Sequence, residues 1–191
     1  MNKKFFSHGL MFFIIIFSRG IMSEENKELI YLELKNGRVI IETKPDLAPN
    51  HVKRIKELVS KGHYDGVVFH RVIEDFMAQT GDVKFGNSSN DDYNLSRAGT
   101  GGSDLPNLKA EFSKEKHGRG AISMARAQDP DSANSQFFIC FKDCSFLDGQ
   151  YSLGGQVIEG MEYVDQIKLG EGNSGSVKEP DKILKMELST Q

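Results

Sequence analysis

Short apolar segments with a period of two recur along this chain and constrain its fold more than any other feature. Segments of this kind, bounded by Gly, Asn, Asp or Pro, are typical of β-strands that bury one face. They occur at residues 29–34, 38–43, 67–82, 120–125, 135–141, 151–158 and 181–188. The third is interrupted at Glu74-Asp75, and Asn36-Gly37 predicts a tight hairpin turn between the first two. The chain is therefore predicted to be mainly β.

Two other segments show the spacing of an amphipathic helix. In residues 45–62, apolar side chains recur on one stripe, Pro49 suits the first helical turn and Gly62 suits the end. Residues 160–170 form the second predicted helix. Its inward-facing residues are Met161, Val164 and Ile167. Strands and helices do not alternate one for one, so the pattern predicts a mostly antiparallel barrel or sandwich whose open ends the helices cover.

Residues 1–20 have the layout of a secretory signal peptide. Lys3 and Lys4 precede an unbroken apolar run at residues 10–17, and small residues occupy the −3 and −1 positions of a cut after Gly20. The run is shorter than the roughly 20 residues that a transmembrane helix needs. We therefore predict that residues 1–20 direct export and are then removed.

The remaining residues, 21–191, suit a single domain with its own core. Two alternatives stay open. Arg19 disfavours the cut, so the segment could remain as an anchor, and Met22 could be the start of a cytoplasmic protein. We expect a periplasmic or secreted monomer without stable membrane association after cleavage. The formal net charge of −3 does not indicate a nucleic-acid-binding surface.

The cysteines and histidines do not indicate a metal or a cofactor. Cys140 and Cys144 are spaced C-x3-C, unlike the C-x-x-C of redox motifs and zinc sites. His63 and His70 lie seven residues apart with a strand start between them. We expect Cys140 to be a buried thiol and His70 to be a structural residue that faces away from Arg71. No cofactor and no metal are expected.

Two predicted strands each carry an amide and a large apolar side chain on one face. Gln136 and Phe138 share a face because strand side chains alternate, and Met77 and Gln79 do the same. Arg71 precedes the second pair, and no carboxylate is placed along the same strand to neutralise it. Burying an unpaired charge is costly. If these faces meet, they form an apolar pocket with a few polar groups at its edge, which is the general form of a ligand site.

The chain contains, in this order, the segments FHRVIEDFMAQTGD, AGTGG, ISMARA, NSQFFIC and FLDGQYSLGGQVIEGM. In order and spacing these segments resemble the cyclophilin family of peptidyl-prolyl cis–trans isomerases. The resemblance covers residues 28–188, and PDSANSQFF is similar to the bacterial branch. It implies a mainly β fold, a closed eight-stranded antiparallel β-barrel capped by two α-helices. It also implies a site on the outer face of the barrel.

The resemblance implies roles for individual residues. Arg71 resembles the family's catalytic arginine. The residues that match the lining of the proline pocket are Phe76, Met77, Phe138 and Leu147. The residues that match contacts to the substrate backbone are Gln79, Gly99, Ala125 and Gln136.

Several predicted substrate contacts depart from the family's pattern. Arg126 and Ala127 stand where the family has an Asn-Ala pair. Phe146 replaces a tryptophan found in many members, and Tyr151 occupies a position that is often histidine. Thr80 replaces the first glycine of the usual Gly-Gly-Asp. We expect weak cyclosporin binding because Phe146 lacks the indole N–H donor.

The implied activity needs no nucleophile, acid or metal, because no bond is broken. The barrier to rotation of the peptide bond is ~18–20 kcal/mol, and a typical turnover of roughly 10–10³ per second requires about 4–7 kcal/mol of differential stabilisation. A guanidinium can donate to the proline nitrogen or to the neighbouring carbonyl of the twisted amide. We therefore expect an isomerase that accelerates the folding of proline-containing unfolded or extended polypeptides. The alternative is a cyclophilin-fold peptide-binding module or holdase chaperone with little turnover.

Overall fold

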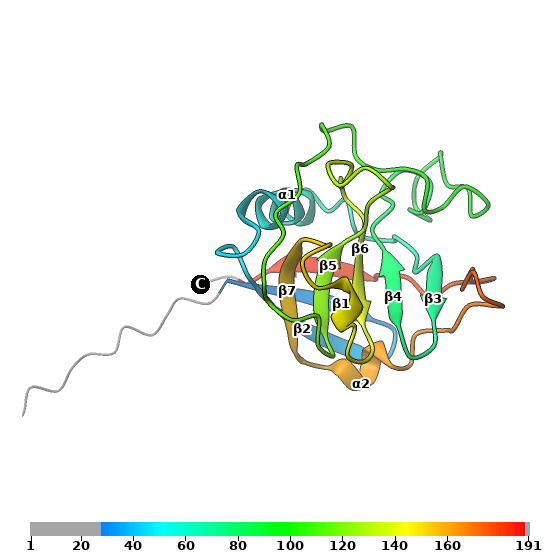
Figure 1. Cartoon of the computed structure of the whole chain (residues 1–191). Helices are drawn as coiled ribbons and strands as arrows, with labels where there is room; N and C mark the ends of the chain where they lie inside the picture. The colour runs from blue at the N-terminus through cyan, green and yellow to red at the C-terminus, as the bar shows by residue number, and fades with distance from the viewer. Residues whose placement is uncertain (1–27, 190–191) are drawn as a thin grey trace, which may run out of the picture.

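The computed structural model describes residues 28–189, in which eight β-strands form one curled antiparallel sheet (Figure 1). The strands are β1 (Leu29–Leu34), β2 (Gly37–Thr43), β3 (Arg71–Ile73), β4 (Met77–Thr80), β5 (Ala121–Met124), β6 (Phe137–Cys140), β7 (Leu153–Glu159) and β8 (Lys185–Leu188). Their spatial order is β3-β4-β6-β5-β7-β2-β1-β8. The prediction of a mainly β, eight-stranded antiparallel fold is confirmed. The predicted signal peptide, residues 1–20, lies outside the described residues.

The closure of the barrel is less complete than predicted. β3 and β8 are the two ends of the sheet, and no ladder joins them within residues 28–189. The segments before these strands are joined by an isolated bridge between Val68 and Lys182. The Phe69 N–H donates to the Asp181 carbonyl at 2.8 Å, and the Ile183 N–H donates to the Val67 carbonyl at 2.9 Å. Residues 181–183, predicted as part of the last strand, therefore bridge the ends of the sheet, and β8 is correspondingly shorter.

Two α-helices lie at opposite ends of the curled sheet, as Figure 1 shows. α1 (Pro49–Ser60) begins at the predicted proline and buries Val52, Leu58 and Val59. α2 (Met161–Val164) is shorter than the predicted helix over residues 160–170. The Gln166 and Ile167 N–H groups donate to carbonyls three residues back, so tight turns replace the helix after its first turn. No helix among residues 28–189 is long and apolar enough to cross a membrane.

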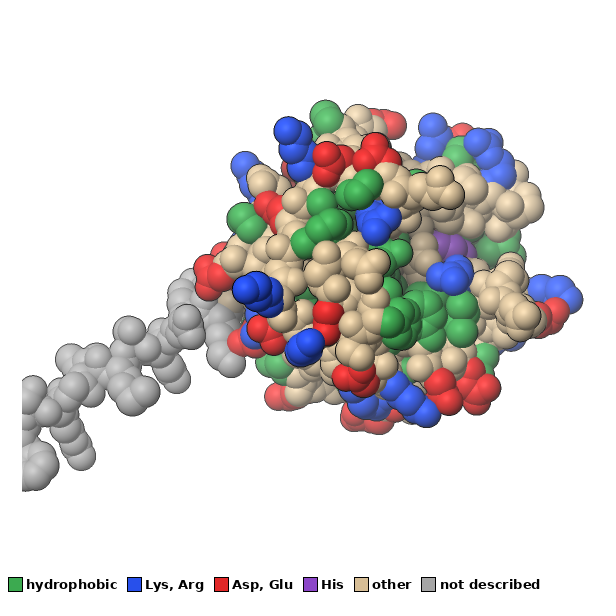
Figure 2. Space-filling model, viewed as in Figure 1, with side chains coloured by type: hydrophobic (Ala, Val, Ile, Leu, Met, Phe, Trp, Pro, Cys, Tyr) green, Lys and Arg blue, Asp and Glu red, His purple; other side chains and the backbone are tan. Residues whose placement is uncertain are grey.

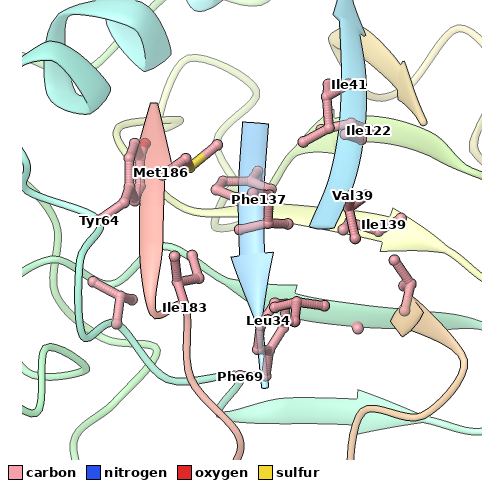
Figure 3. Close-up of a cluster of buried hydrophobic side chains, with 14 of the residues drawn as sticks. Leu34, Val39, Ile41, Tyr64, Phe69, Ile122, Phe137, Ile139, Ile183 and Met186 are labelled. Carbon is pink, nitrogen blue, oxygen red and sulfur yellow. The ribbon is translucent and has the colours of Figure 1, made fainter. Parts of the chain in front are cut away.

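The main core fills the inside of the curled sheet (Figure 3). Phe137 and Ile139 of β6 point into this core, whereas Phe138 and Cys140 belong to a second apolar cluster on the opposite face. Side chains alternate across a strand, so β6 serves both clusters. The prediction that these residues separate onto two faces is confirmed, and the outer face of β6 carries the candidate site.

Candidate functional site

An apolar cluster covers the outer face of β4 and β6. Met77 and Phe138 are its buried centre, and Leu147 reaches it from a 3-10 turn at Ser145–Leu147. The Phe76 ring packs against the Phe146 ring at 5.3 Å between centroids, and Phe146 is 62% exposed. Figure 2 shows hydrophobic side chains gathered on this face of the molecule, near a basic side chain and a histidine. The structure thus brings together the residues predicted to line a proline pocket.

Arg71 begins a chain of side-chain hydrogen bonds beside this cluster. Arg71 and Gln79 are cross-strand partners, and Arg71 Nη1 donates to Gln79 Oε1 at 3.2 Å. Gln79 Nε2 donates to Gln136 Oε1 at 3.0 Å. Gln136 Nε2 donates to the Gly99 and Gly101 carbonyls at 3.0 and 2.8 Å. All of these bonds run in one direction: Arg71 donates to Gln79, Gln79 donates to Gln136, and Gln136 donates to the loop carbonyls. Each bond therefore polarises the next, and the two amides are held in fixed orientations.

The Arg71 guanidinium is half-buried and keeps its charge available. Among residues 28–189 no carboxylate lies within ion-pair distance of it. Its Nε donates to the Ser174 carbonyl at 3.1 Å, so two of its five N–H groups are used within the described protein. The remaining N–H groups can donate to a ligand on the outer face. Backbone and amide oxygens therefore hold the cation in place without neutralising it.

A groove of about 490 Å³ adjoins the apolar cluster. Six of the predicted contact residues line it: Gln79, Gly99, Ala125, Arg126, Ala127 and Gln136. The Ala125 N–H donates to the Gln136 carbonyl at 2.9 Å, which joins the two sides of the groove. The groove residues that the sequence did not single out are Thr100, Gly101, Gly102, Ser103, Asn107, Ser132 and Asn134. The Gly-rich composition of AGTGG was the available signal for the first three.

Asp82 is a buried carboxylate that sequence reasoning did not assign to the site. Its Oδ2 accepts the Gly99 and Gly101 N–H groups, both at 2.8 Å. Its Oδ1 accepts the Lys84 and Phe85 N–H groups at 3.1 and 2.9 Å. These four N–H groups solvate the charge in place of water. Asp82 therefore fixes the loop whose carbonyls hold Gln136.

His70 is buried directly beneath the same loop. A Cβ on Gly99 would lie 2.9 Å from the His70 ring, so the loop packs closely on the imidazole. Both ring nitrogens lack a hydrogen-bond partner among the described residues. Burial lowers the pKa of His70 to about 4, opposed by the nearby charge of Asp82. His70 is therefore neutral near pH 7.

Protonation of His70 should destabilise the fold in acid. Its folded pKa of about 4 is below the ordinary value of 6.5, so the unfolded chain binds the proton more readily. This contribution to stability is present above pH 6.5 and is lost as the pH falls to about 4. It amounts to ~3 kcal/mol at one pKa unit per 1.36 kcal/mol. Urea unfolding of the wild type and of His70→Gln between these pH values should show a shallower pH dependence in the variant. Equal slopes would contradict the assignment.

The two cysteines are free and buried. Burial raises the pKa of both thiols, so they are protonated near neutral pH. The prediction that Cys140 is a buried thiol is confirmed. The described residues contain no group of three or more His, Cys, Asp or Glu side chains arranged to hold a metal ion.

Comparison with solved structures places the curled sheet in the cyclophilin fold. Cyclophilin AquaCyp293 from Hirschia baltica superposes with a TM-score of 0.69 at 27% sequence identity, covering 84% of this chain and 73% of that chain. A second crystal structure, with a TM-score of 0.72 at 24% identity, is that of a Cryptosporidium parvum cyclophilin type peptidyl-prolyl cis-trans isomerase. It was determined in the presence of the dipeptide Ala-Pro. It covers 85% of this chain and 99% of that chain.

Sequence comparison gives the family directly. Residues 29–188 match the family described as cyclophilin type peptidyl-prolyl cis-trans isomerase/CLD. The chain is 59% identical over 160 residues to the probable peptidyl-prolyl cis-trans isomerase of Brucella abortus, covering 83% of this chain and 81% of that protein. It is 36% identical over 157 residues to the peptidyl-prolyl cis-trans isomerase of Helicobacter pylori, covering 79% and 88%. The chain therefore belongs to the cyclophilin-type peptidyl-prolyl cis–trans isomerase family, as its motifs predicted, and its enzyme class is isomerase.

Proposed function

We propose that the outer-face site catalyses rotation about X-Pro peptide bonds without a covalent intermediate, and that Arg71 is its catalytic residue. The observation that carries the proposal is the half-buried Arg71 guanidinium, held by Gln79 and Ser174 beside an apolar cluster and not neutralised by a carboxylate among the described residues. Its unused N–H groups can donate to an amide that lies against the cluster. Hydrogen bonds to a charged group contribute about 1.5–3 kcal/mol, and the transition state of rotation can use them because its nitrogen gains a lone pair.

The apolar cluster supplies the second part of the stabilisation. Phe76, Met77, Phe138 and Leu147 present the surface on which a pyrrolidine ring would pack. The planar amide is the more dipolar form and loses hydration there, which favours the twisted form. Gln79 keeps one amide N–H that no described residue accepts, and it can hold the carbonyl side of the bond. Both N–H groups of Gln136 are used on Gly99 and Gly101, so Gln136 acts by orienting Gln79 and the loop.

The test is exchange spectroscopy on a short Ala-Pro peptide with residues 24–191. We expect turnover on the order of 10–10³ per second, compared with uncatalysed isomerisation over tens of seconds. The rate should be nearly constant between about pH 6 and 8, because an arginine does not titrate there and His70 has a pKa of about 4. A bell-shaped profile would contradict the mechanism. Binding without turnover would instead favour the peptide-binding module or holdase.

We also propose that the chain is exported, loses residues 1–20, and acts as a monomer in the periplasm or outside the cell. The basic start, the apolar run and the small residues before position 21 support export. N-terminal sequencing of the native protein tests cleavage, and light scattering tests the monomer. A native chain that begins at Met22 or Ser23 would contradict export.

A further inference from the structure

Arg126 carries the one charged side chain among the residues that line the described groove. The other lining residues are glycines, alanines and neutral polar side chains. Asp82 lies behind the loop, but four backbone N–H groups already solvate its charge. An extended peptide in this groove therefore meets one lining charge, and that charge is positive.

The Arg126 guanidinium is stacked against the apolar cluster. Its Cζ lies 4.5 Å from the centroid of the Tyr151 ring, which is a cation–π distance. The Tyr151 ring in turn packs edge-on against Phe138 at 5.7 Å. Phe138, at the centre of the proline pocket, is thus connected to the Arg126 guanidinium through the Tyr151 ring alone. Arg126 stands at the junction of the apolar cluster and the groove.

Backbone carbonyls hold this guanidinium in one orientation. Nη1 donates to the Ala127 and Gln128 carbonyls at 2.9 and 3.2 Å, and Nη2 donates to the Gln150 carbonyl at 3.1 Å. No carboxylate among residues 28–189 lies within ion-pair distance of it. The two aspartates of the same loop accept hydrogen bonds from backbone N–H groups. Asp129 accepts the Asp131 N–H, and Asp131 accepts the Ala110 N–H. The charge is therefore pre-organised and lacks an anionic partner.

The direction of the substrate decides which of its residues meets Arg126. In the proposed function, the proline ring occupies the apolar cluster and the carbonyl side of the X-Pro bond lies by Gln79, which also lines the groove. The residues before the proline therefore run into the groove and past Arg126. Complementary charge in such a groove contributes to specificity and to the rate of encounter.

We propose that Arg126 makes this isomerase selective for substrates with an acidic side chain one or two positions before the proline. The inference rests on the proposed function, because it assigns the substrate class of the same site. An exposed ion pair has a small effect, whereas a fixed, half-buried guanidinium should give a preference of about three- to tenfold in kcat/KM.

Two pairs of acetylated, amidated peptides test the proposal: Ala-Glu-Pro-Phe against Ala-Gln-Pro-Phe, and Glu-Ala-Pro-Phe against Gln-Ala-Pro-Phe. Exchange spectroscopy gives kcat/KM for each with the wild type, Arg126→Gln, Arg126→Lys and Arg38→Gln. Arg38 is exposed on β2 and pairs with Glu33, so its variant changes the net charge equally but away from the groove. Thermal unfolding of each variant checks that the loop around Arg126 still folds.

The wild type and Arg38→Gln should prefer the glutamate peptide of at least one pair by about three- to tenfold. Arg126→Gln should reduce that ratio to near one, and Arg126→Lys should keep part of it. The ratio should also fall between low and high salt, which a structural role for Arg126 would not cause. Ratios near one in the wild type, with normal turnover of Ala-Pro, would overturn the selectivity and leave the proposed function standing. Absence of turnover on every peptide would overturn the proposed function and this inference with it.

Discussion

Replacing Arg71 with alanine should lower kcat/KM for an Ala-Pro peptide by at least about a hundredfold, which corresponds to about 2.7 kcal/mol of transition-state stabilisation. That loss lies within the range of a charge-assisted hydrogen bond, about 1.5–3 kcal/mol. The bond forms fully only when the amide twists, so the loss should appear mainly in kcat rather than in KM. Exchange spectroscopy at several peptide concentrations separates the two.

Arg71→Lys is the matched variant, because it keeps the positive charge and removes the planar fork. The wild-type guanidinium bonds Gln79 and Ser174 and still has N–H groups for a ligand. A lysine ammonium is a mobile point charge and does not reproduce this geometry. We expect Arg71→Lys to lose at least about tenfold in kcat/KM, and both variants to unfold near the wild-type temperature. An alanine variant that keeps turnover within about threefold of wild type would remove Arg71 from the chemistry.

Strand alternation in the sequence predicted which residues lie on each face of β6, and that Met77 and Gln79 share one face of β4. It could do so because the period of two is a local property of the backbone. The helical spacing of apolar residues predicted α1, and its first-turn proline and the glycine shortly after its end agree with that spacing. The early end of α2 and the late start of β8 were not predicted. β8 starts late because residues 181–183 bridge residues 67–69. After α2, the Lys168 N–H donates to Asp181 Oδ2 and the Gly170 N–H donates to the Val72 carbonyl, which are contacts to segments distant in the sequence.

The residues of the candidate site could be predicted only in part from the sequence. Residue patterns alone placed Arg71, Gln79, Gln136 and Phe138 near a pocket, and the family resemblance supplied positions such as Gly99 that lie in loops. Asp82 was missed because the sequence alone does not distinguish a buried carboxylate from a solvated carboxylate in a turn. The difference appears only when the loop folds back and presents the Gly99 and Gly101 N–H groups to it.

Asp82 gives the second large prediction: Asp82→Asn should lower the free energy of unfolding by about 2–4 kcal/mol. Each carboxylate oxygen accepts two backbone N–H groups. An asparagine has one oxygen, so its amide N–H₂ must face one of the two pairs, donor against donor. The side chain is fully buried, so water cannot readily replace the lost acceptor. Urea unfolding measures the loss.

The same substitution should reduce kcat/KM by about tenfold or more, although Asp82 touches no substrate. The Gly99 and Gly101 carbonyls hold the Gln136 amide, which holds Gln79 beside Arg71. If the loop shifts, this chain of hydrogen bonds loses its fixed geometry. Asp65→Asn is the control, because Asp65 Oδ1 accepts one N–H, from Met186, and an amide oxygen can still do so. A destabilised Asp82→Asn with wild-type kcat/KM would confine Asp82 to stability. An unchanged urea midpoint would show that its four hydrogen bonds do not hold the loop.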